Sequence, residues 1–185
     1  MKTGSRNRGT NTHLRNGFSV SNSAQPCYQT RNMSAEAKIT ELGLELPPAP
    51  PKGGVYKPVV IVNNLAYLSG HGPYQSNGTY LTGRLGEDLT LEQGQAAARQ
   101  TGLALLATMK AELGSLDRVK RVIKTLALVN STDDFAEQPQ TINGYSELFA
   151  EVFGDAGIGA RSALGTNVLP GNIPVEIEVI VEVES

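Results

Sequence analysis

The sequence is poor in the side chains that most enzymes use for metal binding or nucleophilic attack. Its 185 residues include one cysteine, two histidines and no tryptophan. Cys27 lies within the first 32 residues, and His71 is the only histidine after them. From residue 33 onward the chain therefore cannot form a disulfide, a thiolate metal site or a multi-histidine metal site. A cysteine nucleophile is excluded there as well, and a Ser-His-Asp triad would have to use His71.

Long apolar runs are also missing, because no stretch approaches the ~20 residues that a membrane-spanning helix needs. Apolar residues make up 39% of the chain and charged residues 18%, as in an ordinary soluble globular protein. The length fits one domain with a tail. We therefore expect a single folded domain that does not enter a membrane.

Charge is distributed unevenly along the chain. Residues 1–32 carry five basic side chains and no acid, whereas the rest has 16 − 5 = 11 basic and 18 acidic residues, a net charge of −7. The first segment is rich in Ser, Asn, Thr, Gly and Arg, which predicts a disordered basic tail at 1–32 and a domain at 33–185. An acidic body is a poor match for a polyphosphate backbone, so we do not expect nucleic acid as the main partner.

The tail has three interpretations. Residues 1–32 are either an extension that precedes an effective start at Met33, or an organelle transit peptide, or a solvated functional arm. Arg and Ser without acids are typical of a transit peptide, whereas the apolar stretch of a secretory signal is missing. We expect a cytoplasmic protein or, if the tail is a transit peptide, one in an organelle such as the mitochondrion.

Periodicity and turn signals predict seven elements. Two apolar runs, at 59–62 and 65–70, are joined by two asparagines and indicate a β-hairpin, because Asn tolerates a positive φ. Thr90 is placed to cap a helix, with Gln93 at the capping-box position and Gly114 as the stop. An apolar face with helical spacing predicts a second helix at about 137–153. Three further strands are expected at 119–129, 161–168 and 175–183. The order β-β-α-β-α-β-β predicts an α+β fold, with two helices on one face of a sheet.

Arg161 is the only basic residue from position 125 to the end of the chain, where ten acidic residues occur. Its rigid fork of donors suits a carboxylate. The pattern by itself favours an ion pair within the chain, with capture of a substrate carboxylate as the alternative. In the last predicted strand, Glu176 and Glu178 point away from the alternating valines. They lie on a solvated face or, in an oligomer, line a cleft.

Two glycine-rich segments, Gly53-Gly54 and Gly70-His71-Gly72-Pro73, match neither a P-loop nor a dinucleotide-binding fingerprint. They indicate turns, or points where the backbone closely approaches a ligand. His71 is a candidate acid, base or polar contact. A structural histidine with satisfied hydrogen bonds is at least as good an interpretation.

The C-terminal part of the chain resembles the signature of the Rid (YjgF-type) family. That signature runs A-R-S, L-P and E-I-E, which match residues 160–162, 169–170 and 176–178. Upstream, Tyr56 and Ser69-Gly70 match an early Tyr and a later Ser-Gly of the family, with a spacing of 13 between Tyr and Ser. Further matches extend the resemblance over about residues 36–183.

The resemblance implies a chorismate-mutase-like fold and a homotrimer with three clefts between subunits. By position, Arg161 would pair with the substrate carboxylate and Glu176 would handle the hydrolytic water. Tyr56, Ser69 and Gly70 would line the pocket. Two substrate-pocket positions depart from better-known members. Ala163 stands where many carry Cys, and His71 stands where Gln is common.

The activity implied by the resemblance is hydrolysis of 2-enamine or 2-imine acids such as 2-aminoacrylate to a 2-ketoacid and ammonia. Because such substrates already hydrolyse in water, an Arg that orients them and a carboxyl that moves a proton are sufficient, with no metal or cofactor. The expected partners are small 2-imino or 2-keto acids and further copies of the chain. One alternative is a non-catalytic protein that binds small carboxylates in the same clefts. Another is a ribonuclease, which the acidic body and single histidine disfavour.

Overall fold

In the computed structural model, residues 34–184 are described, and the predictions for residues 1–32 fall outside this range. A five-stranded sheet has the order β1-β2-β5-β3-β4. Its strands are β1 (Val59–Val62), β2 (Leu65–His71), β3 (Val119–Asn130), β4 (Ala160–Thr166) and β5 (Val175–Val183). β3 and β4 run parallel, and the other neighbours are antiparallel. The helices are α1 (Ala35–Glu41), α2 (Leu91–Leu113) and α3 (Gln138–Phe153).

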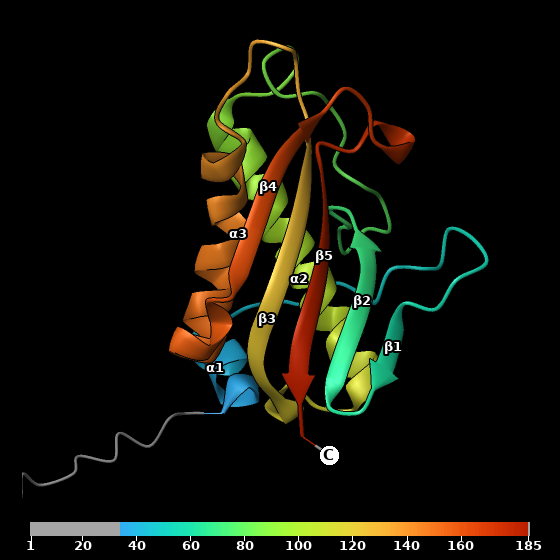
Figure 1. Ribbon diagram of the computed structural model, residues 1–185, viewed down its shortest axis with the longest axis vertical. Coiled ribbons are helices and arrows are strands. Elements are labelled where there is room, and N and C mark those ends of the chain that lie inside the picture. The colour runs from blue at the N-terminus through green and yellow to red at the C-terminus, as the bar shows by residue number, and fades with distance from the viewer. Residues whose placement is uncertain (1–33, 185) are drawn as a thin grey trace, which may run out of the picture. The chain divides into compact units, whose positions relative to one another are not determined.

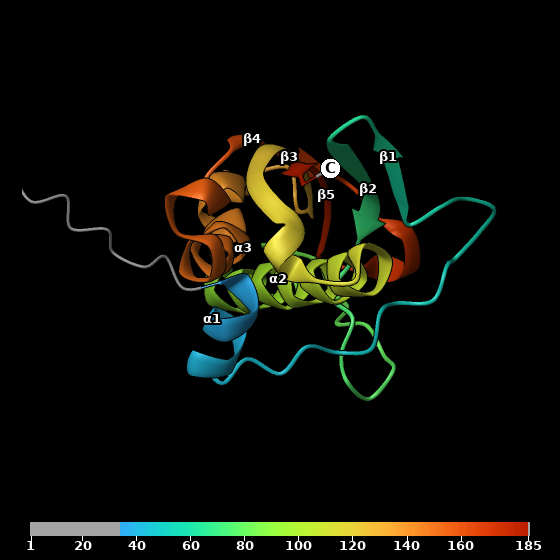
Figure 2. The same ribbon diagram turned by 90° about the horizontal axis from the view of Figure 1, so that it is seen from below.

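The structure confirms the predicted α+β order and adds one short helix. α1 was not predicted, because its seven residues are too few for a clear apolar period. Figure 2 shows α2 and α3 side by side beneath one face of the sheet, with α1 beyond them. The predicted two-helix layer is therefore correct.

Local sequence signals account for the hairpin and for α2. Asn63 has a φ of 55°, which lets β1 turn directly into β2. The Thr90 side chain accepts from the Gln93 backbone, and the Gln93 side chain accepts from the Thr90 backbone, which completes the predicted capping box. Gly114 ends the helix with a φ of 83°.

The core lies between the sheet and the two long helices. The alternating residues of β5 are all buried there: Val175, Ile177, Val179, Val181 and Val183. On α3, the apolar face that includes Tyr145 and Phe149 packs into the same core. Their ring centroids are 4.3 Å apart. Burial of this alternating pattern fixes which face of β5 carries its glutamates.

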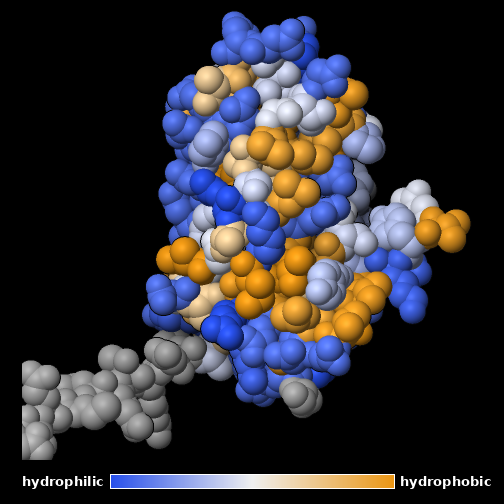
Figure 3. All heavy atoms as spheres, in the orientation of Figure 1, coloured by the Kyte–Doolittle hydropathy of each residue, from blue (hydrophilic) through white to orange (hydrophobic). Residues whose placement is uncertain are grey.

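The other face of the sheet is not covered by α2 or α3, and it faces the viewer in Figure 1. Figure 3 shows apolar side chains gathered on this face, between polar ones. Among the described residues of its strands, the large exposed apolar side chains on this face are Val60, Val62, Tyr67 and Leu164. An apolar surface of this kind is typical of a protein–protein contact.

Candidate functional site

A cavity of about 550 Å³ opens at the end of β2, beside β5. Five parts of the chain form it: the 53–56 loop, the end of β2 with Gly72 after it, Tyr80, the turn at 170–173, and Glu176 of β5. Glu176 is the only charged residue in the lining that the structure describes. A site with one carboxyl group and no cation can handle a proton or a water molecule, but it does not by itself hold an anionic substrate.

The Glu176 side chain lies directly over the backbone of Gly70. A Cβ atom at position 70 would collide with Oε1 of Glu176. The register between β2 and β5 shifts between Leu68 and His71, so β2 carries an irregularity at this point. The sequence predicted a close neighbour of the backbone at Gly70. That neighbour is the Glu176 side chain of the same chain, and the glycine leaves room for it because it has no side chain.

The environment of Glu176 favours its protonated form. Burial raises the pKa of this half-buried carboxyl above its ordinary value, and the neighbouring Glu178 carboxylate raises it further. A carboxyl whose pKa is moved toward neutrality exchanges a proton more readily at working pH than an exposed glutamate does. The cavity thus contains one group suited to acid–base chemistry.

Tyr56 and Ser69, to which the family resemblance assigns a place in the pocket, line the cavity beside Gly70. The Tyr56 hydroxyl accepts a hydrogen bond from the Gly53 backbone at 3.1 Å, which leaves its proton available to another acceptor. The Ser69 hydroxyl donates to the Lys57 carbonyl at 2.8 Å. This bond ties the loop that carries Tyr56 to β2.

His71 does not line the cavity. Its ring is 7% exposed and lies in the core. Nδ1 lies 2.7 Å from the Ser69 carbonyl and must donate to it, so Nε2 accepts from the Thr108 hydroxyl at 2.8 Å. Burial lowers the pKa of His71, and the bond to Ser69 only partly opposes this. The geometry is that of the structural histidine considered from the sequence, not that of a substrate contact.

Arg161 lies on β4 and reaches toward α3. Its guanidinium donates to Asn143 Oδ1 at 3.0 Å, Ser146 Oγ at 2.9 Å and the Pro139 carbonyl at 3.2 Å. All three partners are neutral. None of the five ion pairs between residues 34 and 184 includes Arg161. The prediction of an ion pair for Arg161, which the charge pattern favoured, is thus wrong for this part of the chain. Ala163 lies two residues after Arg161 on the same strand.

One copy of the chain does not bring Arg161 and Glu176 together. Arg161 pairs with Thr125 on one side of β3, and Glu176 pairs with Leu128 on the other side. They are separated by about 10 Å along the strands and about 10 Å across them. Arg161 points to the helix-covered face, whereas Glu176 alternates with buried β5 residues and points to the open face. Tyr56, Ser69, Gly70 and Glu176 form one cluster, and Arg161 with Ala163 lies elsewhere.

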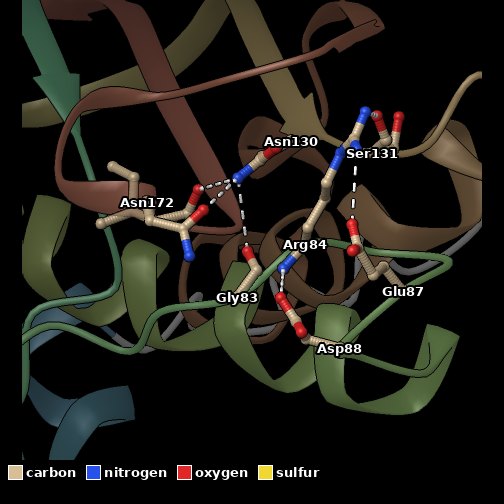
Figure 4. A network of polar contacts seen from close by, with 8 residues as sticks. Gly83, Arg84, Glu87, Asp88, Asn130, Ser131 and Asn172 are labelled. Atoms are coloured by element: carbon tan, nitrogen blue, oxygen red, sulfur yellow. Dashed lines mark hydrogen bonds and ion pairs between the residues drawn. The ribbon is translucent and has the colours of Figure 1, made fainter.

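A polar network holds the turn at 170–173 in place (Figure 4). Asn130 is buried at the end of β3, and its Nδ2 donates to Asn172 Oδ1 at 3.1 Å. The same nitrogen lies 3.3 Å from the Ile173 carbonyl and 3.4 Å from the Gly83 carbonyl. The Gly83 backbone also donates to the Asn172 carbonyl at 2.8 Å. One side chain therefore joins the cavity turn to the loop that precedes α2.

Sequence reasoning missed three features of the cavity: Tyr80, the turn at Pro170 and Gly171, and Ile173. Pro170 belongs to the L-P part of the family signature, which was the available signal for the turn. Tyr80 lies between the predicted hairpin and the predicted helix after Thr90, in a segment for which no helix or strand was predicted. Its aromatic ring was the sole hint that this loop contributes to a site.

Comparison with known proteins identifies the family. The family model described as "YjgF/chorismate_mutase-like, putative endoribonuclease" matches residues 36–183. The chain belongs to the YjgF-type Rid family. Protein TCP17 of Trypanosoma cruzi is 41% identical over 150 residues, which are 80% of this chain and 94% of that protein.

Two solved structures show that the similarity of this Rid protein to known proteins includes the three-dimensional fold. Protein Atu1372 of Agrobacterium tumefaciens is 40% identical with a TM-score of 0.74, over 82% of this chain and 94% of that one. A structure described as a "putative endoribonuclease" from Shewanella oneidensis MR-1 is 32% identical with a TM-score of 0.78, over 82% of this chain and all of that one. The chorismate-mutase-like fold predicted from the sequence is thereby confirmed.

Between residues 34 and 184, no helix has both the length and the hydropathy to cross a bilayer. No group of three or more His, Cys, Asp or Glu side chains there is arranged to hold a metal ion.

Proposed function

We propose that this Rid protein is a hydrolytic deaminase of 2-imine and 2-enamine acids, acting in clefts between the subunits of a homotrimer. The observation that carries the proposal is the separation of two complementary groups. Glu176 lies in a cavity whose described lining has no cation. Arg161 has only neutral partners among the described residues and points to the other face of the sheet.

The reaction requires the two groups to work on one substrate. Water attacks C2 of the imine, which forms the new C–O bond and breaks the π bond of C=N, while Glu176 accepts a proton from that water. Glu176 then returns this proton to the nitrogen, which gives a carbinolamine. Transfer of the hydroxyl proton to the nitrogen and cleavage of the C–N bond release ammonia and leave a 2-ketoacid. An enamine such as 2-aminoacrylate first takes up a proton at its terminal carbon and loses one from its nitrogen to become the imine.

Arg161 of a neighbouring subunit would hold the substrate carboxylate. Its guanidinium offers paired donors in a fixed plane, which fixes the orientation of the planar 2-imino acid. Asn143 and Ser146 hold that fork through neutral bonds, so its positive charge is not cancelled before substrate arrives. Ala163, two residues further along β4, would adjoin the same substrate through its backbone.

The uncovered sheet face supports assembly. It exposes Tyr67, at 42%, and Leu164, at 53%. A cyclic trimer buries the same face of each copy and places the edge of one subunit beside the cavity of the next. Such an arrangement would give the Glu176 cavity the cation that its described lining lacks.

A ribonuclease is a weaker proposal for the same cavity. Cleavage of a phosphodiester needs stabilisation of added negative charge. The single charged group of the described lining is an acid, and the one histidine of the body is buried away from it. RNA cleavage that survives both repeated purification and Arg161→Ala would indicate a contaminant or a separate site.

The test is a coupled assay in which an amino-acid oxidase generates the imine and the loss of imine is followed. We expect the wild type to accelerate hydrolysis and Arg161→Ala to lower kcat/KM by about 100-fold, since orientation is lost. Arg99→Ala, which removes an exposed arginine paired with Glu151 on the helices, is the matched control and should keep full activity. Equal rates for wild type and Arg161→Ala would refute the deaminase. Binding of a 2-ketoacid without turnover would instead support the carboxylate-binding alternative.

A further inference from the structure

The cavity has a second end that the hydrolytic chemistry does not use. Gly72, Tyr80 and Ile173 meet there. A Cβ atom at position 72 would lie 2.7 Å from Ile173 Cδ1 and 3.3 Å from the Tyr80 ring. Gly70, with the Glu176 carboxyl over it, marks the other end. The cavity therefore runs from a carboxyl group to an apolar and aromatic wall.

Tyr80 is held in place by its surroundings. Its ring lies against Tyr74, with centroids 5.0 Å apart and planes at 56°. Residues 74 and 80 also form an antiparallel bridge, and the Leu81 backbone donates to the Pro73 carbonyl at 3.1 Å. The Tyr74 carbonyl accepts from Gln100 on α2. A ring fixed in this way presents a preformed contact surface, at a low cost in conformational entropy.

The distance between the two ends sets the size of a matching ligand. Gly70 and Gly72 are two residues apart in an extended segment, which corresponds to about 6–7 Å. A substrate whose C2 lies at Glu176 needs a branched or aromatic side chain to reach Tyr80 and Ile173. A three-carbon acid such as 2-aminoacrylate would leave that wall without a contact.

We propose that Tyr80 is a specificity-determining residue that directs this site toward 2-imino acids with branched or aromatic side chains. The proposal rests on the proposed deaminase function and names its substrate class. Tyr80 touches the substrate side chain and takes no part in proton transfer. It therefore changes the relative kcat/KM of substrates, not the chemistry that they share.

The experiment compares imines generated by an oxidase from alanine, leucine and phenylalanine, using the full chain. We expect the wild type to have a kcat/KM at least about tenfold higher for the leucine and phenylalanine imines than for the alanine imine, as several added methylene-sized contacts would give. Tyr80→Ala should lose that preference, so its kcat/KM should fall more on the leucine and phenylalanine imines than on the alanine imine. Tyr80→Phe keeps the ring and should keep the preference. The ratio of kcat/KM between the bulky imines and the alanine imine therefore reports the substrate preference separately from any general loss of activity.

Three outcomes would overturn the specificity proposal: no preference in the wild type, an equal loss on all imines in Tyr80→Ala, or a gain on the bulky imines in that variant. Calorimetry with pyruvate, 4-methyl-2-oxopentanoate and phenylpyruvate separates this proposal from the deaminase itself. Tighter binding of the two larger acids, lost in Tyr80→Ala, would support the specificity of the site even if no imine were turned over. Absence of both turnover and binding would refute both proposals.

Discussion

The two halves of the candidate site are built in opposite ways on one sheet. Near β2 and β5, a glycine leaves room for a glutamate, and burial opposes the charge of that glutamate. On β4, an arginine is supported by an amide, a hydroxyl and a carbonyl, and it keeps its charge without an acidic partner in the described chain. Each half lacks what the other has. Under the proposal of a site shared between subunits, each half would complete the other across an interface between two copies.

The largest effect is expected from Glu176→Gln, which keeps the shape of the side chain and removes its proton chemistry. We expect kcat to fall by about 1,000-fold with little change in KM, since general acid–base catalysis contributes on this scale. The folded-state pKa of Glu176 is raised above its unfolded value, so its stabilising contribution exists at low pH and is lost as the pH rises. The variant should therefore unfold at the same or a higher temperature at neutral pH. Glu151→Gln, at an exposed ion pair on α3, is the control.

A smaller loss is expected from Gly70→Ala, which touches only the β2–β5 half. The new Cβ atom pushes the Glu176 carboxyl from its place, so kcat should fall by less than in Glu176→Gln. In the Glu176→Gln background the same change should cost no further activity, because the carboxyl is already gone. A full additional loss in the double variant would show that Gly70 acts independently of Glu176.

The pH dependence tests the charge environment of the same half. If Glu176 acts as a base, kcat/KM should fall as the pH drops through its raised pKa. Glu178→Gln removes the like charge that contributes to this shift, so the acid limb should move to lower pH. A rate profile that does not move would contradict the assignment of Glu176 as the titrating group.

The smallest effect is expected on the free energy of unfolding, and it comes from His71, which belongs to neither half of the candidate site. Burial depresses the folded-state pKa of His71 below its unfolded value of about 6.5. Its contribution is therefore fully present above about pH 6.5 and is lost as the pH falls through the folded-state value. Urea unfolding of the wild type should show this loss below about pH 6.5. His71→Gln should flatten that part of the curve without changing kcat/KM for imines.

Much of the fold could be predicted because local chemistry determines it. The asparagine turn, the Thr90 cap and the alternation of β5 are set by residues close in sequence. The partners of Arg161 could not be predicted, because they depend on β4 pairing in parallel with β3 beneath α3. Charge counting favoured an acid, whereas the fold supplied Asn143 and Ser146.

The site residues show the same contrast between what the sequence signals and what tertiary packing determines. Tyr56, Ser69, Gly70 and Glu176 were found through the family signature and lie together at one cavity. Tyr80 reaches that cavity from a loop whose path depends on contacts with Tyr74 and α2. No periodicity marks such a residue, since loop geometry arises from tertiary packing.

The most direct test of the shared site is complementation between two inactive variants. Arg161→Ala and Glu176→Gln chains are mixed in equal amounts, unfolded and refolded together, and assayed for imine hydrolysis. In a cyclic trimer with sites between subunits, random assembly leaves about a quarter of the sites with both groups intact, so about a quarter of the wild-type rate should return. Mixing Arg161→Ala with the Arg161→Ala/Glu176→Gln double variant should restore nothing. No recovery in the first mixture, with trimers formed, would contradict the account and place both groups in a site within one chain.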